Sequence, residues 1–422
     1  MDRGTASVEK KGGLRELLFN VPLYVKESIF RTGYPDTPRK RAAMIVNTLF
    51  LHIHPARVQL HSLQPTYTLG LGLLSFFLFA ILGLTGVLLM FYYVPSVELA
   101  YGWMQDLIFV VPFGRIMRNL HRWTAHAMVV VVFLHMCRVF YTAAYKPPRE
   151  FNWVVGVFLL VLTLGSSFTG YLLPWDQLSF WAITVATNIV SYLPLLGDWI
   201  RFLLLGGNMV GGEALLRFYV LHVAVLPILT TALIAYHFWR IRKDGGLARP
   251  SGGGREVGTG LRSWSAIKGR GRVTGPEAKN TILSFPRLIY IELLVLLGLL
   301  ILFLPVSFLF DGPLAQIADP EHPPNPAKAP WYFLGLQELV SYSAFWGGVV
   351  IPSLVILGLL LLPYLDRDKR GVGVWFARER RGVIILWTLF VLAVALLTLI
   401  GAYFRGPNWN FYWPWEGWPG PD

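Results

Sequence analysis

Seven apolar segments of membrane-spanning length dominate this chain of 422 residues. A helix needs about 20 mostly apolar residues to cross the hydrocarbon core of a bilayer. With 55% hydrophobic and 14% charged residues, against about 25% charged residues in a soluble domain, we predict an all-α integral membrane helical bundle. The segments lie near residues 67–93, 120–141, 152–174, 217–239, 288–309, 347–364 and 383–404.

The positive charge of the chain indicates how the bundle is oriented. The formal net charge is +13, and Lys and Arg crowd the N-terminus and the connections after the second, fourth and sixth segments. With seven spans these four basic regions share one face, which the positive-inside rule makes cytoplasmic. We therefore expect a protein of the cell membrane with a cytoplasmic N-terminus and an external C-terminus. Membrane lipids are its expected surroundings, and its basic face requires no nucleic acid as a partner.

A Gly/Arg-rich stretch over 241–283 has no apolar periodicity and is typical of a flexible cytoplasmic linker. It separates a four-helix part, 66–240, from a three-helix C-terminal part, 284–422, that carries an external Pro-rich loop. Residues 1–65 are expected to form a cytoplasmic segment, with an amphipathic surface helix near 14–31.

Four histidines lie inside the apolar segments, as the pairs His121 and His135, and His222 and His237. An ionisable side chain at membrane depth is costly and indicates a functional site. Helical spacings of 14 and 15 residues separate the members of a pair by roughly 21 to 22 Å and turn them only about 40 to 60° apart. Each helix should therefore present one imidazole near each membrane face.

Topology determines how the histidines combine. The second and fourth spans both run from outside to inside, so His121 and His222 should lie near the outer face and His135 and His237 near the inner face. Iron with two imidazole ligands is an electron-transfer centre. We predict two stacked bis-histidine haem b sites, each with one ligand from each helix. The alternative is a transporter that uses four hydrogen-bonded histidines as proton relays.

Glycines repeat the same interval of 14 residues in the first and third spans. Gly72 and Gly86, and Gly156 and Gly170, would let a flat macrocycle approach the backbone, although glycines also serve close helix packing.

Two arginines, Arg118 and Arg138, each lie three residues from a histidine, where a guanidinium could hold a haem propionate. Snorkelling of interfacial arginines is the alternative.

The single cysteine, Cys137, excludes a cysteine-ligated cluster or a CxxCH haem attachment within the chain.

The other five histidines are predicted to be structural or solvated. His126 points about 140° away from His121 on the same helix. Of the remaining four, His52, His54 and His61 precede the first span, and one of them could line an inner quinone pocket. His322 lies in the external loop.

Several motifs together resemble the cytochrome b subunit of quinol:cytochrome c (bc) and plastoquinol:plastocyanin (bf) complexes. The interval of 15 residues between His222 and His237 is similar to that of the short bf-type cytochrome, and the part from about 275 to 404 resembles the separate three-helix bf subunit, here fused. The motifs are NLHRW at 119–123, LHMCRVFY at 134–141, TGYLLPWDQ at 169–177, RFYVLH at 217–222 and HFWRIRK at 237–243.

The resemblance implies a mechanism and partners. Such cytochromes oxidise quinol at an outer site, passing one electron to a Rieske iron–sulfur protein and the other through the outer and inner haems to a quinone at an inner site, with proton translocation. A c-type cytochrome or equivalent acceptor and a homodimeric complex are also implied. Arg217, in the motif before His222, is expected beside the cofactor, and Arg242 matches a basic residue near the inner quinone site.

One departure concerns the outer quinol pocket, which the resemblance places at Pro174–Gln177 and around Trp331 and Tyr332. The family's motif there is Pro-Glu-Trp-Tyr, but this chain has Pro330 in place of the proton-accepting glutamate. Glu338 and Asp176 are the candidate substitutes, since a general base must reach the hydroxyl that it deprotonates. For Glu338 the alternative is that it caps a helix or pairs with a cation.

A second departure concerns a further haem. The bf-type cytochrome binds it through a cysteine just before the first span, and the matching residues Tyr67–Gly70 contain none. We expect no covalent third haem. The alternative function is a dihaem membrane anchor that connects the quinone pool with another dehydrogenase or a hydrogenase, although such anchors usually lack a three-helix extension.

Overall fold

The seven predicted spans are confirmed as helices in a computed structural model of the chain. The structure describes residues 36–47, 54–244, 246–250, 281–366, 368 and 370–418. The expected surface helix at 14–31, His52 and most of the linker lie outside them. The spans are α4 (Leu71–Met90), α6 (Gly114–Tyr141), α7 (Glu150–Leu172), the continuous α10 (Gly212–Val220), η2 (Leu221–Val225) and α11 (Leu226–Lys243), η3 (Ser284–Leu288) with α14 (Ile289–Leu309), η4 (Trp346–Val350) with α16 (Ile351–Leu365), and η5 (Arg378–Arg380) with α17 (Arg381–Leu399) and η6 (Ile400–Phe404).

These helices are apolar on nearly every side. Leu84 and Leu294 are each 66% exposed and Leu386 is 70% exposed, which in water would be unfavourable for such large apolar side chains. In lipid the helix satisfies its own backbone hydrogen bonds, and outward-facing leucines match the hydrocarbon. The multi-pass membrane architecture therefore follows from composition and length.

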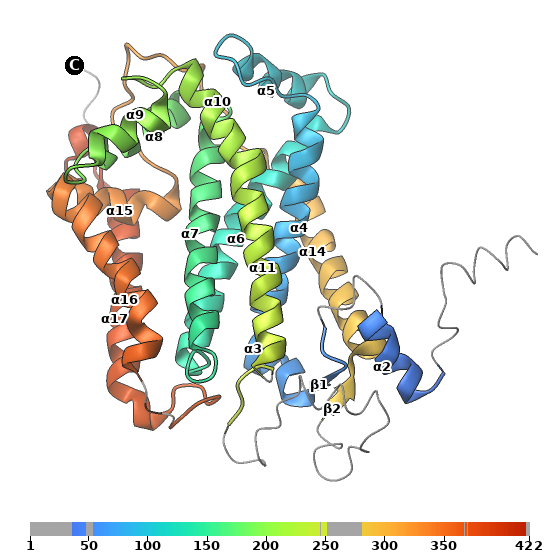
Figure 1. Cartoon of the computed structure of the whole chain (residues 1–422). Helices are drawn as coiled ribbons and strands as arrows, with labels where there is room; N and C mark the ends of the chain where they lie inside the picture. Colours follow the sequence, from blue (N-terminus) through green and yellow to red (C-terminus); the bar gives the residue numbers. More distant parts are fainter. Residues whose placement is uncertain are drawn as a thin grey trace, which may run out of the picture.

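Short helices cover one end of the bundle, which we call the upper end as drawn in Figure 1. The lower end carries the basic connections, so the upper end corresponds to the face that the charge pattern predicts to be external. The upper helices, none of which was predicted as a separate element, are α5 (Ala100–Phe109), α8 (Gln177–Val190), α9 (Gly197–Leu205), α15 (Trp331–Tyr342) and the turn η7 (Pro407–Trp409).

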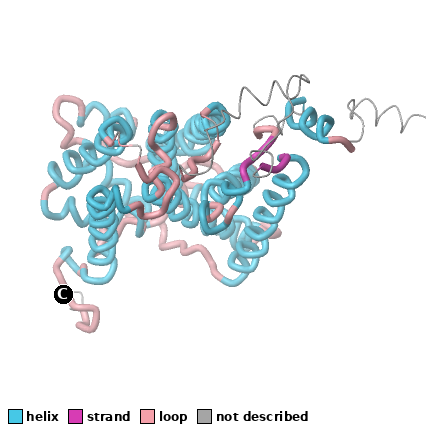
Figure 2. The backbone as a smooth tube through the Cα atoms, turned by 90° about the horizontal axis from the view of Figure 1, so that it is seen from below, coloured by secondary structure: helices cyan, strands magenta, loops and turns pink. Residues whose placement is uncertain are grey.

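At the lower end, a two-stranded sheet joins the segment before the first span to the segment that begins at Thr281. β1 (Arg57–Gln59) pairs antiparallel with β2 (Thr281–Leu283), with Val58 opposite Ile282, and Figure 2 shows the two strands beside the helices. The other lower elements are α2 (Pro38–Asn47), η1 (Leu60–Leu63) and α3 (Pro65–Thr68).

The C-terminal spans flank the four-helix part on two sides. α4 packs on α6 and α7 packs on α11, while α14 packs on α6 and α4 and α16 packs on α7. Figure 1 shows α14 on one side of the bundle, and α16 and α17 on the other. The linear order of the chain did not indicate this arrangement.

A buried ionic cluster at the lower end ties the α6–α7 connection to the α16–α17 connection. The Lys146 ammonium lies 2.9 Å from an oxygen of Asp366, and its side chain is fully buried. The Tyr145 hydroxyl donates to Asp366 at 2.5 Å and accepts from Arg380 at 2.7 Å. Burial acts to raise the pKa of Asp366, but the bonds from Tyr145 and Lys146 lower it overall. The carboxylate therefore holds two distant loops together.

We expect Asp366→Asn to lower the thermal unfolding temperature of the detergent-solubilised protein, because it leaves Lys146 buried without its counter-charge. Removing one partner of a buried ion pair costs up to roughly 3–5 kcal/mol. Asp368→Asn is the matched control, since the Asp368 carboxylate makes its ion pair with exposed Arg370 and acts on Lys146 only through a weaker electrostatic interaction. Equal unfolding temperatures for the two variants would contradict the role of Asp366 in holding the two loops together.

Candidate functional site

The upper histidine pair has the separation that two imidazoles on one metal require. The ring centres of His121 on α6 and His222 on η2 are 6.1 Å apart, with the ring planes at 76°. With metal–nitrogen distances of about 2.0–2.1 Å, two imidazoles on opposite sides of a metal have centres roughly 6 Å apart. Nδ1 of His121 lies 2.9 Å from the Thr85 hydroxyl, and Nδ1 of His222 lies 3.0 Å from the Ser166 carbonyl oxygen. A bonded Nδ1 leaves Nε2 available as the ligand atom.

A π-helical turn explains the unequal spacing of the two histidine pairs. His222 lies within η2, the π turn Leu221–Val225. Such a turn accommodates one extra residue in an otherwise α-helical segment. The 15 residues from His222 to His237 therefore advance like 14 residues of regular helix, roughly 21 Å, and match the interval in α6. No residue pattern predicted this turn.

The lower pair consists of His135 on α6 and His237 on α11, which lie within electrostatic range of each other. Nδ1 of His135 and Nδ1 of His237 are both buried and have no hydrogen-bond partner, although the backbone of Asn152 lies beside His237. A buried polar atom without a hydrogen-bond partner calls for an explanation. A binding site for another group at this level fits this observation.

Each predicted glycine faces one of the four imidazoles, from α4 toward α6 and from α7 toward α11. Gly170 and Gly72 therefore make room for the facing histidine rings themselves, a closer relation than the predicted approach of a macrocycle, whereas a Cβ at Gly86 or Gly156 would make ordinary contact. A Cβ built on each glycine would lie 3.1 Å (Gly72 to His135), 3.4 Å (Gly86 to His121), 3.8 Å (Gly156 to His237) and 2.4 Å (Gly170 to His222) from the Cε1 atom of the facing histidine.

Arg138 supplies a buried cation at the lower level. Its Nε donates to the Tyr67 carbonyl oxygen at 3.2 Å, and its guanidinium carbon lies 4.6 Å from the centre of the Tyr67 ring. Its Nη2 is buried without a hydrogen-bond partner. This arrangement fits the predicted contact with a propionate.

The upper arginines are arranged differently from the prediction. Arg118 donates to the carbonyl oxygens of Gly312 and Pro313 at 2.7 and 2.9 Å, so both of its terminal nitrogens hold the α14–α15 loop. Arg122, one turn further, has a buried Nε without a partner. The geometry thus favours Arg122 over Arg118 as the cation that a propionate would meet. Sequence spacing alone could not separate the two.

The other two predicted arginines lie at the ends of the fourth span. Arg217 donates to the Leu203 carbonyl oxygen and so holds α9 against α10. That contact gives it a local structural role. Arg242 lies in the last turn of α11, at the lower end.

The two levels together fit a haem b at each. At each level the chain offers two imidazoles, glycine backbone beside them and an arginine with a buried nitrogen that has no hydrogen-bond partner. In the described part of the chain, no group of three or more His, Cys, Asp or Glu side chains is placed to hold a metal ion, whereas a bis-imidazole haem needs two.

The Trp331–Tyr332 segment begins α15 and contacts α6. The indole Nε1 of Trp331 donates to Nδ1 of His126 at 2.9 Å, and the His126 and Tyr332 ring centres lie 5.9 Å apart. Burial, together with neighbouring Tyr171, raises the pKa of Tyr332 to about 12, so its phenol is neutral. His126 does point away from the paired histidines as predicted, but it lies at this aromatic cluster. The cost of burying an ionisable group could have indicated it from sequence.

Asp176 has a structural role at the upper end. Its Oδ1 accepts from the backbone N–H of Ser179 at 2.9 Å, capping α8, and its Oδ2 accepts from the N–H of Ala315 at 2.9 Å. The neighbouring Gln177 Oε1 accepts from the N–H of Asp319 at 2.6 Å. The Pro174–Gln177 region therefore anchors the α14–α15 loop.

Glu338 is fully buried in an ion pair. Its carboxylate lies 2.6 Å from Nη2 of Arg405 and also accepts from the Tyr342 hydroxyl at 2.9 Å and the Trp409 indole at 3.0 Å. Burial acts to raise the pKa of Glu338, but these bonds, led by that of Arg405, bring it below its ordinary value of 4.5. Of the two interpretations of Glu338, the structure favours pairing with a cation over proton acceptance.

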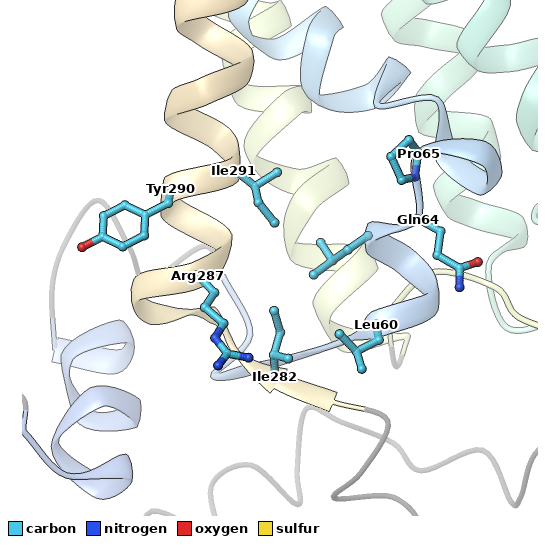
Figure 3. A pocket seen from close by; sticks show the side chains of 8 residues that line it. Leu60, Gln64, Pro65, Ile282, Arg287, Tyr290 and Ile291 are labelled. Atoms are coloured by element: carbon cyan, nitrogen blue, oxygen red, sulfur yellow. The ribbon is translucent and has the colours of Figure 1, made fainter.

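A shallow cavity of about 530 Å³ opens at the lower end between η1, α3 and α14 (Figure 3). It contains none of the paired histidines. Nearby, His54 pairs with Glu292 at 2.9 Å and His61 packs on Tyr67. Its lining residues are Leu60, Leu63, Gln64, Pro65, Ile282, Arg287, Tyr290 and Ile291.

Known proteins share both halves of this arrangement. Residues 56–245 match the family model described as cytochrome b/b6/petB. Residues 317–412 match that described as cytochrome b(C-terminal)/b6/petD. The cytochrome b6 of Heliobacterium modesticaldum is 47% identical over 192 residues, 46% of this chain and 88% of the relative. The chain belongs to the cytochrome b/b6 family. This cytochrome b therefore binds haem b.

Further relatives agree. The cytochrome b6 of Euglena gracilis is 43% identical over 175 residues, 42% of this cytochrome and 81% of the relative. Among solved structures, a chain of a hyperthermophilic respiratory Complex III superposes with a TM-score of 0.69 at 25% identity, covering 90% of this cytochrome and 91% of that chain. A b6-like part and a petD-like part are thus joined in one chain.

Gly170→Ala should disturb the upper haem of this cytochrome. The added Cβ would lie 2.4 Å from Cε1 of His222, so the ring would have to leave its place. Gly156→Ala, on the same helix, is the control because its Cβ would meet His237 at an ordinary 3.8 Å. We expect a lower haem-to-protein ratio and an altered reduced-minus-oxidised spectrum only in the first variant. An unchanged Gly170→Ala spectrum would refute this packing argument.

Glu338→Gln should destabilise the cytochrome, because it removes the buried partner of half-buried Arg405, and breaking a buried ion pair costs up to roughly 3–5 kcal/mol. The folded pKa of Glu338 lies below 4.5, so the carboxylate stabilises the folded state above that pH and loses this effect as the pH falls below it. Thermal unfolding should therefore separate variant and wild type at neutral pH and less so under acid conditions. Glu321→Gln, in the exposed loop, is the control. A pH-independent difference would contradict the ion pair.

Proposed function

We propose that this cytochrome b carries electrons from quinol across the membrane, as the cytochrome b subunit of a bc/bf-type quinol oxidoreductase complex coupled to proton translocation. The observation that supports this most directly is the placement of two histidine pairs at two levels between two helices. The levels are roughly 21 Å apart, a large part of the approximately 30 Å hydrocarbon core.

In this proposal His121 and His222 hold the outer haem, and His135 and His237 hold the inner haem. A haem held by two imidazoles supplies one-electron transfer with no open position for another ligand. Thr85 orients the ring of His121 through its Nδ1 atom. Gly170 and Gly72 leave room for the rings of His222 and His135.

Two arginines complete the proposed haem sites. Arg138 would donate to a propionate of the inner haem and Arg122 to a propionate of the outer haem. Each has a buried nitrogen without another partner. Charge-assisted hydrogen bonds from guanidinium to carboxylate are among the strong ones.

The outer quinol site lies at Trp331 and Tyr332, near the upper end. The neutral Tyr332 phenol can both donate and accept a hydrogen bond, so it can bind quinol or quinone without taking a net charge. A Rieske iron–sulfur protein and a c-type cytochrome, or an equivalent acceptor, would dock at this end. The complex would be a homodimer, as the family resemblance implies.

The lower end would face the cytoplasm, because its connections carry most of the Lys and Arg residues. An inner quinone site would lie here, near Arg242 at the end of α11. The petD-like part favours this function over a dihaem anchor for another dehydrogenase, because such anchors usually lack it.

We expect two b-type haems per chain by pyridine haemochrome assay. His237→Leu should remove the inner haem and leave the outer haem reducible by quinol, because each haem takes its ligands from a different level. His322→Leu is the control, since this histidine lies in the exposed loop with its side chain 79% accessible. One haem or three in the wild type, or loss of both spectral signals in His237→Leu, would refute the proposed pairing.

A further inference from the structure

A fifth histidine within the membrane-spanning helices has no part in holding haem. His126 lies on α6, five residues after His121, and therefore on another face of the helix. That face meets the start of α15. Its ring centre lies 5.6 Å from that of Trp123, 6.4 Å from that of Trp331 and 5.9 Å from that of Tyr332. His126 thus belongs to the aromatic cluster to which we assign the outer quinol site.

The hydrogen bond from Trp331 defines the state of the His126 ring. An indole N–H can only donate, so the lone pair on Nδ1 of His126 must accept, at 2.9 Å. The neutral ring then carries its proton on Nε2. Trp331 is 41% exposed, so its indole can be displaced more easily than a fully buried group. A quinol hydroxyl, which is also a donor, could replace the indole N–H on the same lone pair.

Among the described residues, the two carboxylates that the sequence offers as substitutes are both engaged. Pro330 stands where the resemblance places a glutamate. Both oxygens of Glu338 accept from Arg405, Tyr342 or Trp409.

Asp176 is engaged as well. Its two oxygens accept from the backbone N–H groups of Ser179 and Ala315. Breaking either carboxylate network would leave buried polar groups unpaired, which is unfavourable.

We propose that His126 accepts the proton of quinol at the outer site, in place of the missing glutamate. The inference rests on the function proposed above. The quinol O–H bond breaks, an N–H bond forms at Nδ1, and both electrons of the O–H bond stay on oxygen. The resulting quinolate anion is oxidised by a one-electron acceptor of the iron–sulfur class outside this chain. The imidazolium, now with two N–H groups, passes the Nδ1 proton to water at the upper end and takes up its bond with Trp331 again.

Few other charged or titratable groups surround His126. Arg122 lies one turn earlier on the same helix and interacts with it electrostatically. From α15 the facing group is the Tyr332 phenol, next to Tyr171 of α7. Because Tyr332 keeps its proton to a pKa of about 12, it does not compete with His126 as the base near neutral pH.

The test uses membranes that contain the assembled complex, with a short-chain naphthoquinol or benzoquinol as substrate. His126→Asn keeps an acceptor oxygen at the position of Nδ1 but has no group that titrates near neutral pH. We expect quinol oxidation to slow roughly 10²-fold, as removal of a general base commonly does, with haem content and spectrum unchanged. The wild-type rate should fall on the acid side as the imidazole becomes protonated, and this acid limb should be absent in the variant.

Trp331→Phe distinguishes two possible roles of His126, which are to accept a proton and to hold the Trp331 indole in place. It removes the N–H donor and keeps Nδ1 of His126 available, so the acid limb should persist whatever the change in rate. If His126→Asn oxidises quinol at a near-normal rate with the wild-type acid limb, the proposal is wrong. It is also wrong if Trp331→Phe loses the limb as His126→Asn does, because His126 would then act only by holding Trp331.

The proposed function can fail separately. If quinol does not reduce the haems of the wild-type complex, both the function and the role of His126 are refuted. If quinol reduces the wild-type haems and His126→Asn behaves like the wild type, only the role of His126 is refuted.

Discussion

The structure depends on placing four imidazoles inside an apolar bundle at two levels. An imidazole in hydrocarbon needs both space and a polar partner. The space comes from glycines on the neighbouring helix, where a Cβ at Gly170 would lie 2.4 Å from the His222 ring. The partners for the upper pair are the Thr85 hydroxyl and the Ser166 carbonyl oxygen. The helix pairs α4–α6 and α7–α11 are therefore determined by the histidines as much as by apolar packing.

Much of this was predictable from sequence, because length and period are local properties. Seven apolar runs predicted seven spans, and spacing within a helix predicted which histidines share a level. What could not be predicted depends on contacts between distant segments. The engagement of Glu338 by Arg405 joins α15 to the segment after η6, and no local pattern indicates it. The same holds for Arg118, whose carbonyl partners lie some 190 residues further along the chain.

The upper and lower ends differ in how they are held together. At the upper end, backbone groups of the α14–α15 loop are fastened to Arg118, Asp176 and Gln177, which fixes the approach to the aromatic cluster. At the lower end, the carboxylate of Asp366 joins two loops through Lys146 and Tyr145. In both cases side chains from the four-helix part hold a segment of the C-terminal part. These contacts join the two parts in addition to the linker.

The position of α14 has a consequence for biogenesis. Because a chain emerges from the ribosome with its N-terminus first, the first four spans are complete before α14, α16 and α17 exist. At that stage one flank of the bundle, along α4 and α6, and the opposite flank, along α7, must be covered by lipid. The later helices replace that lipid on both sides in turn. Assembly of this cytochrome is therefore an exchange of lipid for protein around a preformed centre, rather than the docking of a finished second domain.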